Sequence, residues 1–148
     1  KIAEKEKVAQ PETATGETSI RGLHILLAED NELNAEIAAR LLNDEGATVQ
    51  VVRDGQQAID AFASRPQGTY DAILMDIMMP KIDGYTATRV IRSTNRQDAK
   101  AIPIIAMTAH VFDEDVKQCL EAGMNAHLPK PLQMEKVVST IARLCKRK

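Results

Sequence analysis

The sequence predicts an α/β fold, in which a parallel sheet is buried between helices. The first observation is that short apolar runs alternate with amphipathic helical segments over most of the chain. The second is that residues 72–75 are all apolar, lie between Asp71 and Asp76 and are followed by Pro80, which is typical of a strand buried on both faces. The third is that several apolar runs end on an acid, a threonine or a lysine. Open α/β sheets bind ligands at the carboxyl ends of their strands, so these polar residues are candidate site residues.

Length and composition favour one globular domain. The 148 residues are 44% hydrophobic and 27% charged, which is enough to bury a core without disulfides or a structural metal. The net charge of -2 leaves no broad basic surface, and the 3% aromatic content without Trp leaves no stacking platform, so we expect no nucleic-acid partner.

The two cysteines and the hydropathy of the sequence indicate the cellular compartment in which we expect this segment. Cys119 and Cys145 match neither a metal-ligand spacing nor a redox pair, which favours a reducing, cytoplasmic setting. No apolar run approaches the roughly 18 residues of a membrane span, so this segment is not expected to contact a membrane directly. The parent protein can still carry an anchor in the inner or plasma membrane elsewhere.

The first part of the chain divides into a tail, a strand, a helix and a second strand. Residues 1–20 are polar and are predicted to be a flexible linker, and residues 21–147 form the domain. The strand at 23–28 ends on Glu29 and Asp30. Asn31 is predicted to cap a helix that Gly46 stops, and residues 47–52 are typical of a β-branched strand. The apolar residues at helical spacing are Leu33, Ile37, Leu41 and Leu42.

The middle of the chain repeats this alternation. An Asp-Gly turn at 54–55 precedes a short helix through Phe62, which Pro66 and Gly68 close. The central strand at 70–76 follows. A second Asp-Gly turn at 83–84 then precedes a helix that ends near Asn95.

The last part of the chain adds two more pairs. A strand at 102–107 ends on Thr108, and a helix at 113–122 is stopped by Gly123. A strand at 125–128 leads into Pro129-Lys130-Pro131, and a helix at 133–144 closes the chain. The prediction is therefore five strands alternating with five helices.

The strand ends bring together Glu29, Asp30, Asp76, Thr108 and Lys130. Three carboxylates at one edge repel one another and need a counter-charge, which a divalent cation supplies. Oxygen ligands favour Mg²⁺ or Mn²⁺. A nucleophilic carboxylate, a metal, a hydroxyl and an ammonium group are the parts required for phosphoryl transfer to Asp76.

Five stretches of the sequence resemble the receiver domain of two-component response regulators. They are Leu26-Leu27-Ala28-Glu29-Asp30-Asn31, Met75-Asp76-Ile77-Met78-Met79-Pro80, Asp83-Gly84, Met107-Thr108-Ala109 and Leu128-Pro129-Lys130-Pro131. The resemblance covers residues 21 to about 147. It implies a single flavodoxin-like (βα)5 domain with strand order 2-1-3-4-5 and a cis Lys130-Pro131 bond.

The resemblance also implies a role for each site residue. Asp76 is the phosphoacceptor, and Thr108 and Lys130 contact the phosphoryl group. Glu29, Asp30, Asp76 and the backbone carbonyl of Met78 hold Mg²⁺. Thr108 and His127 form the switch, with His127 standing where many receivers have Tyr or Phe.

Three further stretches are most similar to receivers of hybrid sensor histidine kinases. They are Glu29-Asp30-Asn31 with Asn34, residues 106–110 and residues 123–128. This similarity implies a place in a hybrid kinase polypeptide, within a phosphorelay. The expected partner is a phosphohistidine of a kinase domain or of a histidine phosphotransfer domain. The signal passes on by phosphotransfer or by a conformational switch, and no turnover of a separate substrate is expected.

Taken singly, the site residues also fit ordinary structural roles, and rival classes of protein share part of the pattern. The acids fit solvated turns or helix caps, Thr108 fits a strand terminus and Lys130 fits a surface lysine. An aspartyl-phosphate phosphohydrolase shares the nucleophile but needs an acid at the position of Met78. A nucleotide or flavin module needs a glycine-rich loop where residues 29–32 stand. A degenerate receiver that only docks is disfavoured by the complete set of five site residues.

Overall fold

A computed structural model describes residues 19–109 and 113–145, so most of the predicted linker lies outside the described residues. The described part contains a five-stranded parallel sheet with strand order β4-β3-β5-β6-β7. Numbered along the chain this order is 2-1-3-4-5, which confirms the predicted flavodoxin-like topology. The strands are β3 (His24–Ala28), β4 (Thr48–Val52), β5 (Ala72–Asp76), β6 (Ile104–Thr108) and β7 (Ala126–Pro129).

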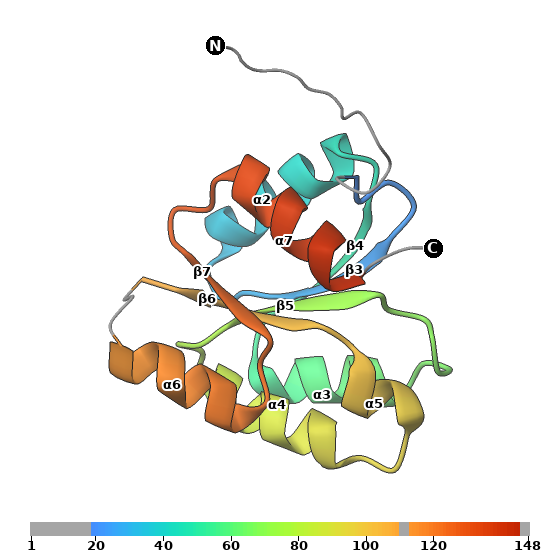
Figure 1. Ribbon diagram of the computed structural model, residues 1–148, viewed down its shortest axis with the longest axis vertical. Coiled ribbons are helices and arrows are strands. Elements are labelled where there is room, and N and C mark those ends of the chain that lie inside the picture. The colour runs from blue at the N-terminus through green and yellow to red at the C-terminus, as the bar shows by residue number, and fades with distance from the viewer. Residues whose placement is uncertain (1–18, 110–112, 146–148) are drawn as a thin grey trace.

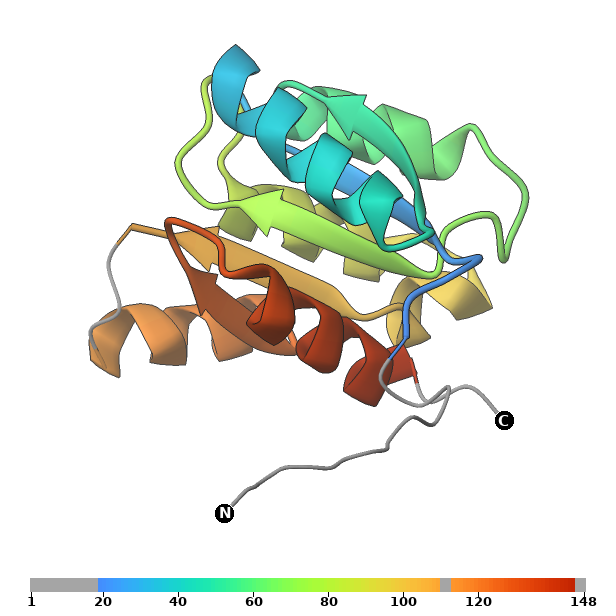
Figure 2. The same cartoon turned by 90° about the horizontal axis from the view of Figure 1, so that it is seen from above.

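Helices cover both faces of this sheet. Figures 1 and 2 show α2 and α7 on one face and the other four helices on the opposite face. The helices are α2 (Glu32–Asp44), α3 (Gly55–Ala63), α4 (Gly84–Ser93), α5 (Gln97–Ala101), α6 (Asp113–Ala122) and α7 (Met134–Cys145). Among the described helices, none has the length and apolar character needed to cross a membrane.

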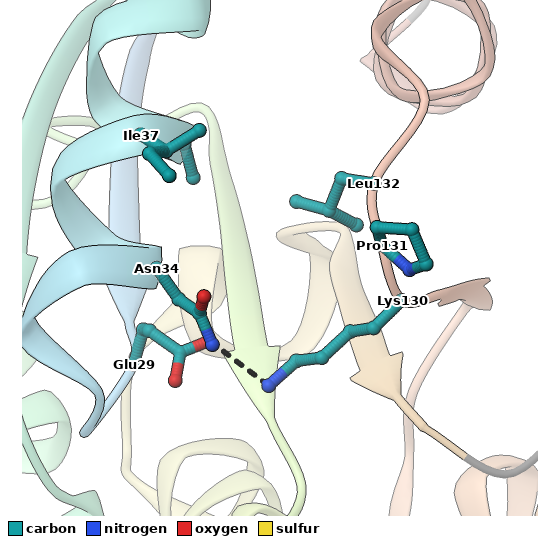
Figure 3. Close-up of a pocket in the computed structure, with 7 residues that line it drawn as sticks. Glu29, Asn34, Ile37, Lys130, Pro131 and Leu132 are labelled. Atoms are coloured by element: carbon teal, nitrogen blue, oxygen red, sulfur yellow. Dashed lines mark ion pairs between the residues drawn. The ribbon is translucent and has the colours of Figure 1, made fainter.

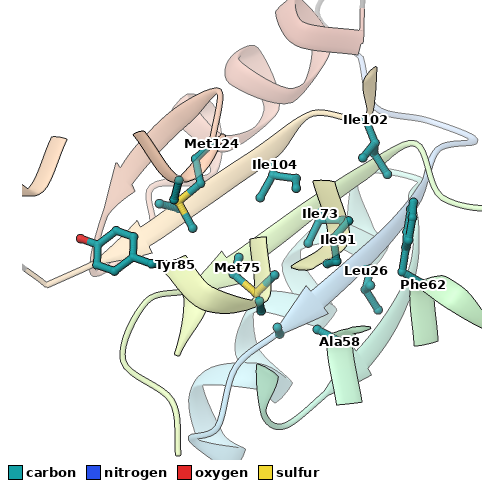
Figure 4. Packing of buried hydrophobic residues seen from close by; sticks show 14 of the residues in the cluster. Leu26, Ala58, Phe62, Ile73, Met75, Tyr85, Ile91, Ile102, Ile104 and Met124 are labelled. Atoms are coloured by element: carbon teal, nitrogen blue, oxygen red, sulfur yellow. The ribbon is translucent and has the colours of Figure 1, made fainter. Parts of the chain in front are cut away.

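The core is divided by the sheet into two layers, because successive strand residues point to opposite faces. In β5, Ile73 and Met75 pack in the layer that contains Phe62 and the helices α3 to α6 (Figure 4). Leu74, between them in sequence, packs in the layer of α2 and α7. All five residues of β5 and of β6 are buried. The apolar run at residues 72–75 is therefore explained, as predicted, by burial of β5 on both faces of the sheet.

The prediction of five helices was wrong, because a sixth helix, α5, lies between α4 and β6. α4 ends at Ser93 rather than near Asn95. Five residues are too few to show a helical period in sequence. The Ile102 amide donates to the Asp98 carbonyl at 2.8 Å as the helix ends, just before Pro103.

The helical periodicities predicted α2 and α6 correctly, and Leu42 is buried as expected, but other side chains of the predicted apolar faces are exposed. In α2 the buried residues include Ala35 and Ala38, whereas Leu33 is 63% exposed and Ile37 is 49% exposed. In α6, Leu120 is 61% exposed. Alanines let the helix backbone pack close to the sheet, which leaves the larger side chains along its flank.

The second Asp-Gly pair, predicted to be a turn from sequence, is the start of a helix. Asp83 is the N-cap of α4 and accepts a hydrogen bond from the Thr86 amide at 2.8 Å. Gly84 lies so close to β5 that a Cβ atom there would collide with the Asp76 carbonyl oxygen. The glycine thus allows α4 to begin directly beside the strand that ends on Asp76.

Candidate functional site

The predicted site residues lie together at the carboxyl edge of the sheet. Asp76 and Thr108 are the last residues of β5 and β6, Glu29 and Asp30 follow β3, and Lys130 follows β7. Because the strands are parallel, all of these positions fall on the same edge. Asp76 and Glu29 are buried, each 3% exposed, and Thr108 is buried too, whereas Asp30 is exposed.

Lys130 joins the buried carboxylates. Its Nζ atom lies 3.0 Å from Glu29 Oε1 and 3.1 Å from Asp76 Oδ2, and Figure 3 shows the pair with Glu29. The Lys130 amide donates to the Thr108 carbonyl at 2.8 Å, which ties the start of the β7–α7 loop to β6. The Lys130-Pro131 peptide bond is cis, as the resemblance implied.

Three carboxylates form a group suited to a divalent cation. One ligand oxygen each from Glu29, Asp30 and Asp76 lie within 4.8 Å of one another. An all-oxygen donor set with three negative charges fits Mg²⁺ or Mn²⁺ better than a softer metal. Lys130 offsets only part of this charge.

Met78 lies directly beyond this group. The Met78 amide donates to Asp76 Oδ1 at 3.3 Å, and its side chain is 74% exposed. The hydrogen bond places the Met78 backbone next to the Asp76 carboxylate. Coordination by the Met78 carbonyl stays a prediction.

The electrostatics of the site favour the uptake of positive charge. Burial raises the pKa of Asp76 to about 6; the hydrogen bond from Lys130 opposes this rise and the nearby Glu29 charge adds to it. Burial on its own lowers the pKa of Lys130, but its bonds to Glu29 and Asp76 outweigh that effect, and the pKa is raised. Lys130 is therefore charged at neutral pH, and Asp76 is ionised at a cost to folding.

That cost gives a testable pH dependence of the metal-free protein. A folded pKa above the ordinary value of 3.8 means that the folded state binds the proton more tightly than the unfolded state. The penalty is thus absent well below pH 4 and complete above about pH 7. Asp76→Asn removes it, so the variant should gain stability over the parent by up to about 3 kcal/mol at pH 8 and by little at pH 4.

Urea unfolding of both proteins in EDTA, from pH 4 to pH 8, measures this difference. Taking the difference between parent and variant cancels the titration of carboxylates that do not interact with Asp76. An equal stability difference at both ends of the range would contradict the raised pKa.

A cavity of about 380 Å³ adjoins Glu29 and Lys130, and sequence patterning did not predict it. Asn34, Ile37 and Ala38 of α2 line one side, and Pro131 and Leu132 line the other (Figure 3). The helical period of α2 included Ile37, but it did not show that this side chain faces a cavity. Apolar side chains of α2 and of the β7–α7 loop therefore line the cavity beside the charged pair Glu29 and Lys130, and we call them the apolar wall of the site.

Two of the remaining predicted residues lie where sequence placed them. Asn31 caps α2, accepting from the Asn34 amide at 2.9 Å, and its own amide also donates to Glu29 Oε2 at 3.1 Å. The second bond, which sequence reasoning missed, orients the Glu29 carboxylate. His127 lies half-buried in β7, opposite Ala106 of β6.

An open parallel sheet of this order, covered by helices on both faces and with polar side chains at its carboxyl edge, defines the class of flavodoxin-like α/β domains. The family model described as "Response regulator receiver domain" matches residues 25–142. The chain belongs to this family, and it is a receiver domain of two-component signalling.

Two of the similar curated relatives are histidine kinases that are much longer than this chain. "Histidine kinase 1" of Arabidopsis thaliana is 39% identical over an alignment that covers 86% of this chain and 13% of the relative. "Osmosensing histidine protein kinase SLN1" of Saccharomyces cerevisiae is 39% identical over an alignment that covers 87% of this chain and 10% of the relative. The chain thus spans only a small part of these relatives.

A solved structure of another receiver domain has the same fold and is described with a bound metal ion. The receiver domain of sensor histidine kinase PA1611 from Pseudomonas aeruginosa is 40% identical and superposes with a TM-score of 0.75. The match covers 85% of this chain and 99% of that one, which is described with a magnesium ion coordinated in its active site cleft.

Proposed function

We propose that this chain takes a phosphoryl group from a phosphohistidine onto Asp76, with Mg²⁺ as cofactor. The observation that carries this proposal is the buried Asp76 carboxylate, grouped with two further carboxylates and paired with Lys130 at 3.1 Å. A buried acid in this setting is not a solvated cap. The similarity to a receiver described with magnesium in its cleft supports the choice of metal.

The chemistry follows from the residues present. A carboxylate oxygen of Asp76 attacks phosphorus in line with the histidine nitrogen; the new O–P bond forms as the N–P bond breaks, and the histidine leaves with the electron pair. Glu29, Asp30, Asp76 and the Met78 carbonyl would hold Mg²⁺. Bound there, the metal would neutralise charge on the phosphoryl oxygens.

Two groups then respond to the product. Lys130 exchanges its bond with the Asp76 carboxylate for one with the phosphoryl oxygens, and the Thr108 hydroxyl donates to the same group. We propose Thr108 and His127 as the switch, since they lie at the end of β6 and in the neighbouring strand β7. The output is a further phosphotransfer or this conformational change.

The surface beside Asp76 supports a protein as the phosphoryl donor. The cavity between α2 and the β7–α7 loop opens next to Lys130, and Leu33 and Ile37 expose apolar side chains on the same helix. An amphipathic helix that carries the phosphohistidine would bury its apolar face on such a surface. From the similarity to histidine kinases we propose that the chain is a cytoplasmic part of a hybrid sensor histidine kinase, with residues 1–20 as the linker and 21–147 as the receiver. The end of this linker needs one correction, because Ile20 is buried in the core of the domain.

Beryllofluoride, a phosphoryl mimic, tests the proposed function directly. Amide chemical shifts of Asp76, Met78 and Thr108 should change when beryllofluoride and Mg²⁺ are added together, and change far less with beryllofluoride alone. Asp76→Asn is the control and should show no such response. Shifts that cluster elsewhere, or that persist unchanged in Asp76→Asn, would rule the proposal out.

A further inference from the structure

The junction between β4 and α3, residues 53–55, lies outside the acidic cluster but contacts two loops beside it, the loop after β3 and the loop after β5. On one side, Arg53 Nη1 donates to the Asp30 carbonyl at 3.3 Å. On the other side, the junction contacts the β5–α4 loop, residues 77–83, through Asp54 and Gly55. It therefore lies where it can fix the two loops relative to each other.

Asp54 uses its two carboxylate oxygens for different purposes. Oδ1 accepts from the Gln57 amide at 2.8 Å, which caps α3. Oδ2 lies 3.5 Å from Lys81 Nζ, in the β5–α4 loop. The Asp54 side chain is only 7% exposed and that of Lys81 is 71% exposed. A buried carboxylate thus holds a lysine from the loop that follows the acceptor.

Gly55 brings the same loop into close contact. A Cβ atom at position 55 would collide with the carbonyl oxygen of Ile82, so only glycine allows this approach. The loop and the start of α3 are packed backbone against backbone at this point.

The backbone of the loop is unusual where the ion pair attaches. Lys81 has φ 69°, the only positive φ among non-glycine residues in the described ranges. A side chain in this left-handed region is disfavoured by roughly 1 kcal/mol, so something must hold it there. The Asp54 carboxylate is the charged group that contacts Lys81.

We propose that Asp54 is a positioning residue for the metal site. Through Lys81 it holds the β5–α4 loop in the arrangement that presents the Met78 carbonyl beside Asp76. This inference rests on the proposed function, because Met78 is a ligand only if the site binds Mg²⁺.

Charge alone and positioning predict opposite results for Lys81→Gln. Removing a positive charge near an acidic metal site should tighten Mg²⁺ binding if electrostatics alone acts. If the ion pair positions the loop, the same variant should bind Mg²⁺ about two- to five-fold more weakly, the range for an ion pair with one exposed partner. Lys81→Arg keeps the charge and should restore the parent affinity.

Asp54→Asn separates the two roles of Asp54. Asparagine caps a helix about as well as aspartate, so α3 keeps its cap while the partner of Lys81 is lost. Asp83→Asn is the matched control, because it also removes one negative charge from an N-cap that precedes a glycine. Asp54→Asn should weaken Mg²⁺ binding more than Asp83→Asn, and combining it with Lys81→Gln should add little further loss.

The measurement is the Mg²⁺ dissociation constant of the whole chain, obtained from the change in the amide chemical shifts of Asp76 and Met78 as Mg²⁺ is added. Urea unfolding in EDTA confirms that each variant folds. Weaker binding by Lys81→Gln with rescue by Lys81→Arg supports the positioning role. Affinity in Lys81→Gln equal to or tighter than the parent overturns it while leaving the proposed function intact. A parent that shows no Mg²⁺-dependent shift at Asp76 overturns both.

Discussion

Asp76→Asn is expected to abolish phosphorylation of the chain by a small phosphodonor, with incorporation falling by at least about 10³-fold, to background. The amide oxygen of asparagine is too weak a nucleophile to attack phosphorus. Asparagine has nearly the shape of aspartate, so the side chain should still fit beside Lys130. Mass spectrometry of the intact protein after incubation with acetyl phosphate or phosphoramidate and Mg²⁺ measures the incorporation.

Asp83→Asn is the control for this experiment. Asp83 is an exposed acid seven residues beyond Asp76, and asparagine keeps its capping bond to the Thr86 amide. It should be phosphorylated like the parent. Undiminished incorporation into Asp76→Asn would mean that another residue accepts the phosphoryl group, and the assignment of Asp76 would fail.

The fold could be predicted from sequence because the three central strands, β3, β5 and β6, are short and largely continuous apolar runs. A run such as residues 72–75 leaves no polar face, so the strand had to lie between two layers of helices. Parallel strands then placed Glu29, Asp76 and Lys130 at one edge without any knowledge of distances. The α/β class and the grouping of the site thus follow from patterning, whereas the strand order 2-1-3-4-5 was implied by the resemblance to receiver domains.

What could not be predicted depends on side-chain direction and on contacts between loops. Leu33 and Ile37 fit a helical period, but the period does not say that Ala35 and Ala38 take the core positions. The pairing of Asp54 with Lys81 joins residues 27 positions apart through two irregular segments, and no periodicity reports such a contact. The apolar wall of the site and the ion pair that attaches the β5–α4 loop were therefore visible only in three dimensions.

The second large effect is expected on the free energy of unfolding, when the charge of Lys130 is removed. Glu29 and Asp76 are each 3% exposed, and Lys130 is the cation that lies within 3.1 Å of both. Removing one partner of a buried ion pair costs about 3–5 kcal/mol, because the remaining charge is left uncompensated. The Lys130 side chain is itself 25% exposed, so water will recover part of that cost.

Lys130→Met should therefore destabilise the metal-free protein by about 2–3 kcal/mol at pH 8. Methionine keeps much of the length of lysine and removes the charge. Lys136→Met, at an exposed position on α7, is the control and should change the free energy of unfolding by less than about 0.5 kcal/mol. Urea unfolding in EDTA measures both variants.

The cost of Lys130→Met should fall as the pH is lowered. The pKa of Asp76 is already about 6 with Lys130 present, and loss of the neighbouring cation raises it further. At pH 5 Asp76 is then protonated in the folded variant, and one of the two uncompensated charges disappears. The penalty is fully present only above the raised pKa, so it should be clearly smaller at pH 5 than at pH 8.

Two further comparisons identify the source of the penalty. In an Asp76→Asn background only Glu29 remains without its partner, so Lys130→Met should cost less there than in the parent. Millimolar Mg²⁺ should recover part of the lost stability at pH 8, since it is a cation that binds the folded state. A cost no larger than that of Lys136→Met, or one that is the same at pH 5 and pH 8, would show that Lys130 does not balance the buried carboxylates.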